Sequence, residues 1–64
     1  MKTKEKLDRA GWTPRFDSRI LELYTRGESK VLYDVTNDMI LVWEHNGVRI
    51  KYPDAVQMDI IFER

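Results

Sequence analysis

Cysteine is absent from the 64 residues of the chain, and histidine occurs once. The first absence excludes disulfide bonds and thiolate metal sites, and a single imidazole cannot form a multi-histidine zinc site. A chain of this length buries only about 60% of the surface that it exposes when unfolded. Small domains commonly depend on a disulfide, a metal or a partner subunit, so oligomerisation is the reinforcement that the sequence leaves open.

Long apolar runs are missing as well. No stretch approaches the about 20 apolar residues that span a membrane, and residues 1–9 are charged and lack the apolar core of a signal peptide. With 42% hydrophobic and 34% charged residues, the composition is that of an ordinary globular protein. We therefore expect one small domain over residues 1–64 and a cytoplasmic location, with which the absence of cysteine is consistent.

Neither sign of charge dominates, because 11 basic residues balance 11 acidic ones. Residues 1–30 contain eight basic and five acidic side chains, whereas residues 31–64 contain three and six, so the halves carry +3 and −3. This asymmetry is compatible with an anionic ligand on the first half, but it also arises when short helices carry lysine and arginine for solubility. A net charge of zero disfavours general binding to duplex nucleic acid.

The first part of the chain, residues 1–29, is predicted to be helical. A short helix can form over Thr3–Ala10, with Thr3 as its N-cap and Gly11 in the left-handed position after its end. This helix has few apolar residues and would be marginal in isolation. Trp12 follows it directly and is expected to anchor the segment to the rest of the domain.

A second helix is expected to begin at Asp17 or Ser18 and to run to about Arg26, where a glycine follows. A strand fits this segment less well, because Ile20 and Leu21 are adjacent and would point to opposite faces. The apolar residues have spacings that suit one helical face: Phe16, Ile20, Leu21, Leu23 and Tyr24.

Residues 30–64 are predicted to form an antiparallel meander. Asn37-Asp38 and Asn46-Gly47 suit two-residue hairpin turns, because these residues tolerate positive φ. These turns join three predicted strands: Lys30–Thr36, Met39–His45 and Val48–Tyr52. The first and the third alternate apolar and polar residues, with Leu32 as the exception. The central strand is apolar on both sides from Met39 to Trp43, so both faces of the sheet need cover, which favours self-association or a partner.

The last segment allows two interpretations. As a strand, Val56–Phe62 alternates apolar and polar residues with one exception. As a helix, it would begin at Asp54 as N-cap, and Gln57 would complete a capping pair. We prefer the strand, because the apolar residues would otherwise spread around the helical cylinder.

The predicted turns determine which residues lie opposite one another. Around Asn46-Gly47 the opposed pairs are Glu44–Arg49, Trp43–Ile50 and Leu41–Tyr52. Around Asn37-Asp38 they are Val35–Ile40, Tyr33–Val42 and Val31–Glu44. Glu44 and Arg49 have opposite charges, which supports the first register independently, although an exposed pair contributes at most ~1 kcal/mol.

This register divides the side chains between two faces. One face holds the main core, on which the helices should pack: Leu32, Met39, Leu41, Trp43, Val48, Ile50 and Tyr52. The other face carries an apolar patch bordered by Glu44, Arg49 and Lys51. Exposed apolar patches usually mark interaction sites, so we predict that this one joins two or more copies of the chain. The residues of the predicted interface are Val31, Tyr33, Val35, Ile40 and Val42.

Four residues of the basic half are candidates for binding an anionic ligand: Trp12, Arg15, Arg19 and Arg26. Arginine holds phosphate and stacks on aromatic rings and bases. The three arginines are spaced by four and seven residues, so they would share one face of a helix. The alternative is a solvated helix face with Trp12 buried.

Motifs for catalysis or metal binding are not found. His45 adjoins the turn at Asn46-Gly47, and its neighbour Glu44 should point to the opposite face, so we interpret His45 as a turn residue rather than a general base. Two aspartate pairs lie near turns, where aspartate usually bonds the backbone: Asp34 with Asp38, and Asp54 with Asp59. We predict no enzyme activity, no metal and no cofactor.

These patterns predict an α+β protein in which one or two short N-terminal helices pack on an antiparallel meander of three or four strands. The predicted function is that of a small non-catalytic binding module, an oligomeric accessory or inhibitory protein of the phage or mobile-element type. Besides itself, its partner would be a host protein or a small nucleotide-like anion. The alternative is a nucleic-acid-binding regulator that uses the basic first half.

Overall fold

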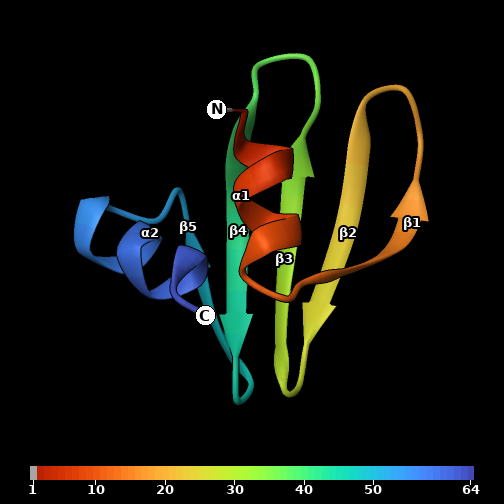
Figure 1. Cartoon of the computed structure of the whole chain (residues 1–64). Helices are drawn as coiled ribbons and strands as arrows, with labels where there is room; N and C mark the ends of the chain where they lie inside the picture. Colours follow the sequence, from red (N-terminus) through yellow and green to blue (C-terminus); the bar gives the residue numbers. More distant parts are fainter. Residues whose placement is uncertain (1) are drawn as a thin grey trace.

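The structure, a computed structural model, describes residues 2–64 and has the predicted α+β class. Two short helices accompany a five-stranded antiparallel sheet whose strands follow one another in chain order (Figure 1). The elements are α1 (Thr3–Arg9), β1 (Thr13–Asp17), β2 (Leu21–Arg26), β3 (Ser29–Asp34), β4 (Met39–His45), β5 (Val48–Lys51) and α2 (Ala55–Phe62). Neither helix formed by these residues has the length and apolar character that crossing a membrane requires.

The second predicted helix is wrong, because this segment forms the hairpin of β1 and β2. The hydroxyl of Ser18 accepts hydrogen bonds from the backbone N–H of Ile20 and Leu21 and so stabilises the turn. Along β2 the side chains alternate, but a charged residue, Glu22, lies on the buried side and is only 5% exposed. Tyr24 lies on the same buried side, whereas Leu21 and Leu23 lie on the other side. Apolar residues therefore occur on both sides of β2, which is why their spacing also suited one face of a helix.

The C-terminal segment is the helix α2 and not the preferred strand. The Asp54 carboxylate accepts a hydrogen bond from the Gln57 N–H at 2.8 Å, and the Gln57 side chain accepts one from the Asp54 N–H at 2.9 Å. This reciprocal capping satisfies two N–H groups that a helix start leaves unpaired. Ile61 is then fully buried against the sheet. The hydrogen bonds of the cap and the burial of Ile61 therefore favour a helix over the strand that the alternation of apolar residues predicted.

Both helices pack on one face of the sheet, here called the covered face. One row of cross-strand neighbours on this face runs over β2 to β5: Tyr24, Val31, Trp43 and Ile50. Leu7 of α1 and Ile61 of α2 close the core above the sheet, and both are fully buried. Figure 1 shows α1 in front of β3 and β4, and α2 beside β5.

The register around Asn46-Gly47 is confirmed, since Glu44 lies opposite Arg49 and Trp43 opposite Ile50. The other register is wrong. The chain turns over residues 35–38 rather than over two residues, and a bulge interrupts the pairing at Leu41. As a result Val31 lies opposite Trp43, and Tyr33 lies opposite Ile40.

This shift corrects the predicted division of the faces. Val31, Tyr33 and Ile40, predicted to face a second copy, lie on the covered face and are at most 3% exposed. Val35 is exposed in the turn, and Val42 lies on the opposite face. Of the predicted core, Trp43 and Ile50 pack beneath the helices, whereas the other members are partly or largely exposed.

The helix α1 ends as predicted, with Gly11 at a φ of 88°, but it begins differently. Thr3 is the first helical residue rather than the N-cap, and Lys2 at the N-cap makes no side-chain capping bond. Instead, the Thr3 N–H donates to the carboxylate of Asp38 at 3.1 Å, and the Thr3 hydroxyl donates to the Asp38 carbonyl at 3.1 Å. The start of α1 is therefore held by the turn between β3 and β4.

Candidate binding face of the sheet

Apolar side chains form a continuous row across the face opposite the helices. The row, here called the apolar row, follows cross-strand neighbours over four strands: Phe16, Leu23, Leu32 and Val42. Within residues 2–64 neither helix covers this face, here called the open face. Phe16 is 57% exposed, and the other three are half-buried. The last three also line a shallow hollow of about 340 Å³.

Charged side chains border the apolar row. The hollow is also lined by Lys30, Glu44, Arg49 and Lys51, of which Lys51 lies directly opposite Val42. Arg15 belongs to the same border, because its Nε donates to the hydroxyl of Thr25, the cross-strand neighbour of Lys30. These five residues, here called the rim, comprise four cations and one anion. The carboxylate of Glu44 is bound by Arg49 at 3.5 Å, so the rim is net cationic.

The sequence pattern placed Val42, Glu44, Arg49 and Lys51 on one face, and the structure confirms this grouping. It missed Phe16 and Leu23, because a helix was predicted where β1 and β2 form. It placed Lys30 and Leu32 on the other face, because the predicted register between β3 and β4 was wrong. The sequence feature that could have indicated strand β2 is the spacing of Leu21, Leu23 and Thr25, because every second residue of a strand lies on the same face. The rim also draws its cations from both halves of the chain, so the charge of each half did not reveal it.

Two of the predicted ligand residues, Trp12 and Arg26, lie together in a structural role. Trp12 is 3% exposed, and its indole N–H donates to the carbonyl of Ile61 at 2.7 Å. The guanidinium of Arg26 stacks on the Trp12 ring at 4.5 Å from its centroid. It also donates to the carbonyls of Ala10 at 2.9 Å and Glu63 at 2.6 Å. These contacts join the ends of both helices to β2.

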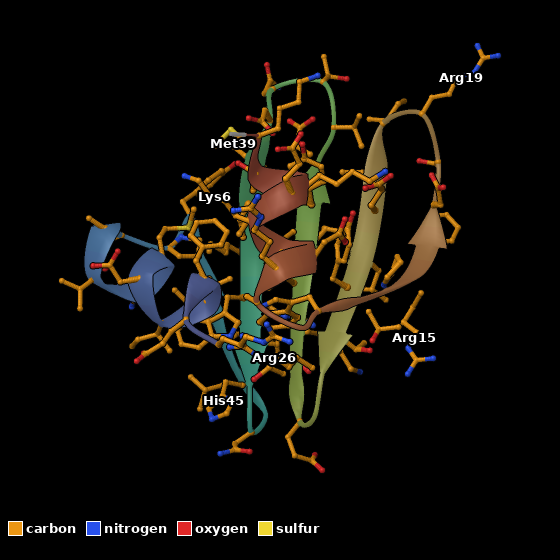
Figure 2. All side chains as sticks on the ribbon, viewed as in Figure 1. Lys6, Arg15, Arg19, Arg26, Met39 and His45 are labelled. Atoms are coloured by element: carbon orange, nitrogen blue, oxygen red, sulfur yellow. The ribbon has the colours of Figure 1, made fainter. Side chains whose placement is uncertain are left out.

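The other two predicted ligand residues lie apart from this pair. Arg15 is on the edge strand β1, and Arg19 lies in the turn between β1 and β2 (Figure 2). Figure 2 shows Arg19, Arg15 and Arg26 at three separate places on the molecule. The shared helical face on which the predicted site depended does not form, because the segment is a hairpin.

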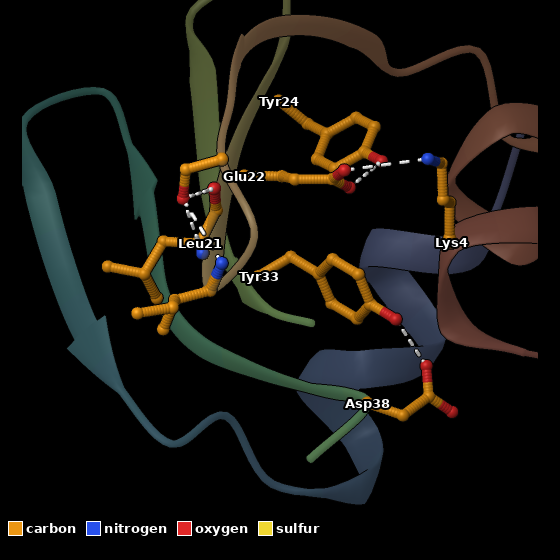
Figure 3. A network of polar contacts seen from close by, with 8 residues as sticks. Lys4, Leu21, Glu22, Tyr24, Tyr33 and Asp38 are labelled. Carbon is orange, nitrogen blue, oxygen red and sulfur yellow. Dashed lines mark hydrogen bonds and ion pairs between the residues drawn. The ribbon is translucent and has the colours of Figure 1, made fainter. Parts of the chain in front are cut away.

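A network of polar groups lies beneath α1 (Figure 3). The Tyr24 hydroxyl donates to the Glu22 carboxylate at 2.6 Å, and Lys4 of α1 pairs with the same carboxylate at 3.4 Å. The Tyr33 hydroxyl donates to Asp38. Burial and these carboxylates raise the pKa of both tyrosines. The hydrogen bond from Tyr33 is the main cause of a lowered pKa at Asp38, so the network joins a protonated donor to an ionised acceptor.

The remaining candidates also serve local structure. The Asp34 carboxylate accepts hydrogen bonds from the backbone and side-chain N–H groups of Asn37, which lower its pKa. Nδ1 of His45 shares a hydrogen bond of 2.5 Å with the Ser29 hydroxyl, and its ring stacks on Trp43. Glu44 points to the open face, as predicted, and so cannot orient this imidazole. In residues 2–64 no three metal-ligating side chains gather at one place.

Comparison of the chain with protein-family models, with curated proteins and with solved structures gave no match.

Proposed function

We propose that the protein is a non-catalytic binding module that takes a protein partner on the open face of its sheet. The observation that carries the proposal is the apolar row, which crosses four strands and is bordered by the cationic rim. Burying an exposed apolar side chain of this size contributes about 1.5–3 kcal/mol. A partner that covers Phe16 and completes the burial of Leu23 and Leu32 would therefore gain several kcal/mol.

A protein partner is favoured by the composition of the row. Binding of single-stranded nucleic acid rests on aromatic rings on which successive bases stack, whereas the row consists of one phenylalanine, two leucines and one valine. The alternative regulator would use Arg15, Arg19 and Arg26. These lie apart, and two nitrogens of Arg26 already donate to backbone carbonyls of both helical ends. In this proposal the module would act as an accessory or inhibitory protein, by occupying its partner.

Affinity capture tests the proposal. Wild-type protein and the variant Leu32→Glu are immobilised and exposed to a nuclease-treated extract of the source cells. Leu32→Glu places a carboxylate in the middle of the apolar row, so proteins that bind the open face should be lost. Arg9→Glu is the matched control, because Arg9 is exposed on α1, on the other side of the sheet.

The expected result is a set of proteins that wild type and Arg9→Glu retain and Leu32→Glu does not. Circular dichroism must show that Leu32→Glu is folded. A second variant, Lys30→Glu/Lys51→Glu, changes only exposed side chains of the rim and should weaken the same binding. Equal capture by all variants would contradict the proposal. So would a parallel capture from an untreated extract that recovers nucleic acid and no protein.

A further inference from the structure

The outer surface of α2 carries apolar side chains that lie in solvent. Ile61, on the inner side, is fully buried, whereas Val56 and Ile60 are 71% and 47% exposed. Residues four positions apart are neighbours on a helix, so Val56 and Ile60 form one short ridge. A surface helix ordinarily presents polar residues to water on this side. The helix is thus apolar on two sides, and the core of the domain uses one of them.

Acidic side chains lie next to this ridge. Asp59 is exposed on α2, and Glu63, which directly follows the last helical residue, is exposed as well. The stretch from Pro53 to Glu63 contains no basic residue. The outer surface of α2 therefore combines apolar groups with carboxylates, whereas the open face combines apolar groups with ammonium and guanidinium groups.

We propose that the partner of the open face is the outer surface of α2 in a second copy of this chain. This inference rests on the proposed function of the open face and names its occupant. The outer surface of α2 and the open face are opposite in charge and similar in length. An eight-residue helix is about 12 Å long at 1.5 Å per residue, and a row that crosses four strands about 4.8 Å apart extends over about 14 Å.

The charges also select the mode of association. Two open faces packed on each other would oppose two cationic rims, which costs free energy. An open face packed on α2 opposes cations and carboxylates. Because α2 packs on the covered face, the two surfaces lie on opposite sides of the sheet, and each copy can bind two neighbours. Such a head-to-tail contact continues into a chain of copies unless its rotation closes a ring.

The contact is expected to be weak. One two-turn helix on a sheet buries less than the about 800 Å² per partner that stable complexes bury. Assembly should therefore appear at concentrations of roughly 100 μM and above and should weaken at high salt, since its charged contacts are exposed.

Sedimentation velocity from about 10 μM to about 1 mM tests this inference on the whole chain. One variant reverses charges of the rim, Lys30→Glu/Lys51→Glu, and another reverses charges of α2, Asp59→Lys/Glu63→Lys. All four residues are exposed, and lysine near the C-terminal end of a helix interacts favourably with its dipole, so both variants should fold. Each variant alone should associate at least about tenfold more weakly than wild type. An equimolar mixture should assemble again, because each altered surface then meets one of opposite charge.

The matched control is Arg9→Glu/Arg19→Glu, which reverses two exposed charges outside both surfaces, changes the net charge as the rim variant does and should assemble like wild type. A wild-type chain that stays monomeric at about 1 mM overturns the inference. So does an α2 variant that assembles like wild type, since the outer surface of α2 then takes no part in the contact between copies. In either case, capture of another protein that Leu32→Glu abolishes would leave the proposed function intact. If Leu32→Glu changes neither assembly nor capture, both proposals fail.

Discussion

Arg26 joins three parts of the fold, and its replacement should destabilise the protein far more than its partial exposure suggests. One of its nitrogens donates to the carbonyls of Ala10 and Glu63, and the other donates to Ile60 at 3.3 Å. Hydrogen bonds that involve a charged group contribute about 1.5–3 kcal/mol each, and the stack on Trp12 adds about 0.5–1 kcal/mol. Water can replace part of these contacts at a half-buried site. We therefore expect Arg26→Ala to lower the free energy of unfolding by about 2–3 kcal/mol.

That loss is large for a domain of 64 residues, whose free energy of unfolding is roughly 3–10 kcal/mol at typical values per residue. The midpoint of thermal unfolding should fall by roughly 10–20 °C. Arg26→Lys keeps the charge but lacks the planar fork, so it should recover only part of the loss. Urea titration followed by tryptophan fluorescence measures the free energies.

The control for this prediction is Arg19→Ala, which removes an exposed arginine from the turn between β1 and β2 (Figure 2). It should change the free energy of unfolding by less than about 0.5 kcal/mol. If Arg26→Ala falls within the same range, then Arg26 does not hold the helical ends to the sheet, and its donors are available for a ligand.

Two further predictions concern the hydrogen bonds at the helix starts. The pKa of Asp38 in the folded protein is lowered by the hydrogen bonds from Tyr33 and Thr3 and so lies below its unfolded value near about 4. Asp38 therefore stabilises the fold above that pH, and this contribution is lost as the pH falls through the folded pKa. The free energy of unfolding of Asp38→Asn should thus decrease less toward acid pH than that of wild type. An equal decrease in both proteins would contradict this prediction. Asp54→Ala removes the N-cap of α2 and should cost about 1 kcal/mol in urea unfolding, whereas the exposed control Asp59→Ala should cost less than about 0.5 kcal/mol.

For the hairpin of β4 and β5, the sequence alone was sufficient to predict the turn and the register of the two strands. Asn46 and Gly47 both adopt positive φ, which a two-residue turn requires and which these residue types tolerate. Once this turn is set, the pairing of Glu44 with Arg49 follows. The turn between β3 and β4 resembled it in composition, but the chain uses four residues there and a bulge at Leu41. A bulge shifts the register without a signal in the apolar pattern, so the faces of β3 were assigned incorrectly.

The elements assigned to the wrong class have a different cause. In β2 the buried position of Glu22 depends on Tyr24 and on Lys4 of α1, which lies 18 residues away and cannot be paired with it from local patterns. In α2 the capping residues gave the correct answer, but the apolar residues on two sides argued for a strand. If the outer ridge of α2 serves a second contact, the function of this helix obscured its periodicity. The predicted phage-type origin stays a prediction.

The attachment of Thr3 to Asp38 has a consequence for the order in which the chain folds. A helix of seven residues is unstable in isolation, and the group that receives its first N–H lies 35 residues further along the chain. That receptor exists only when β3 and β4 have come together around their turn. We therefore expect the helix at the start of the sequence to form late in folding, so substitutions within it should accelerate unfolding and leave the rate of refolding nearly unchanged.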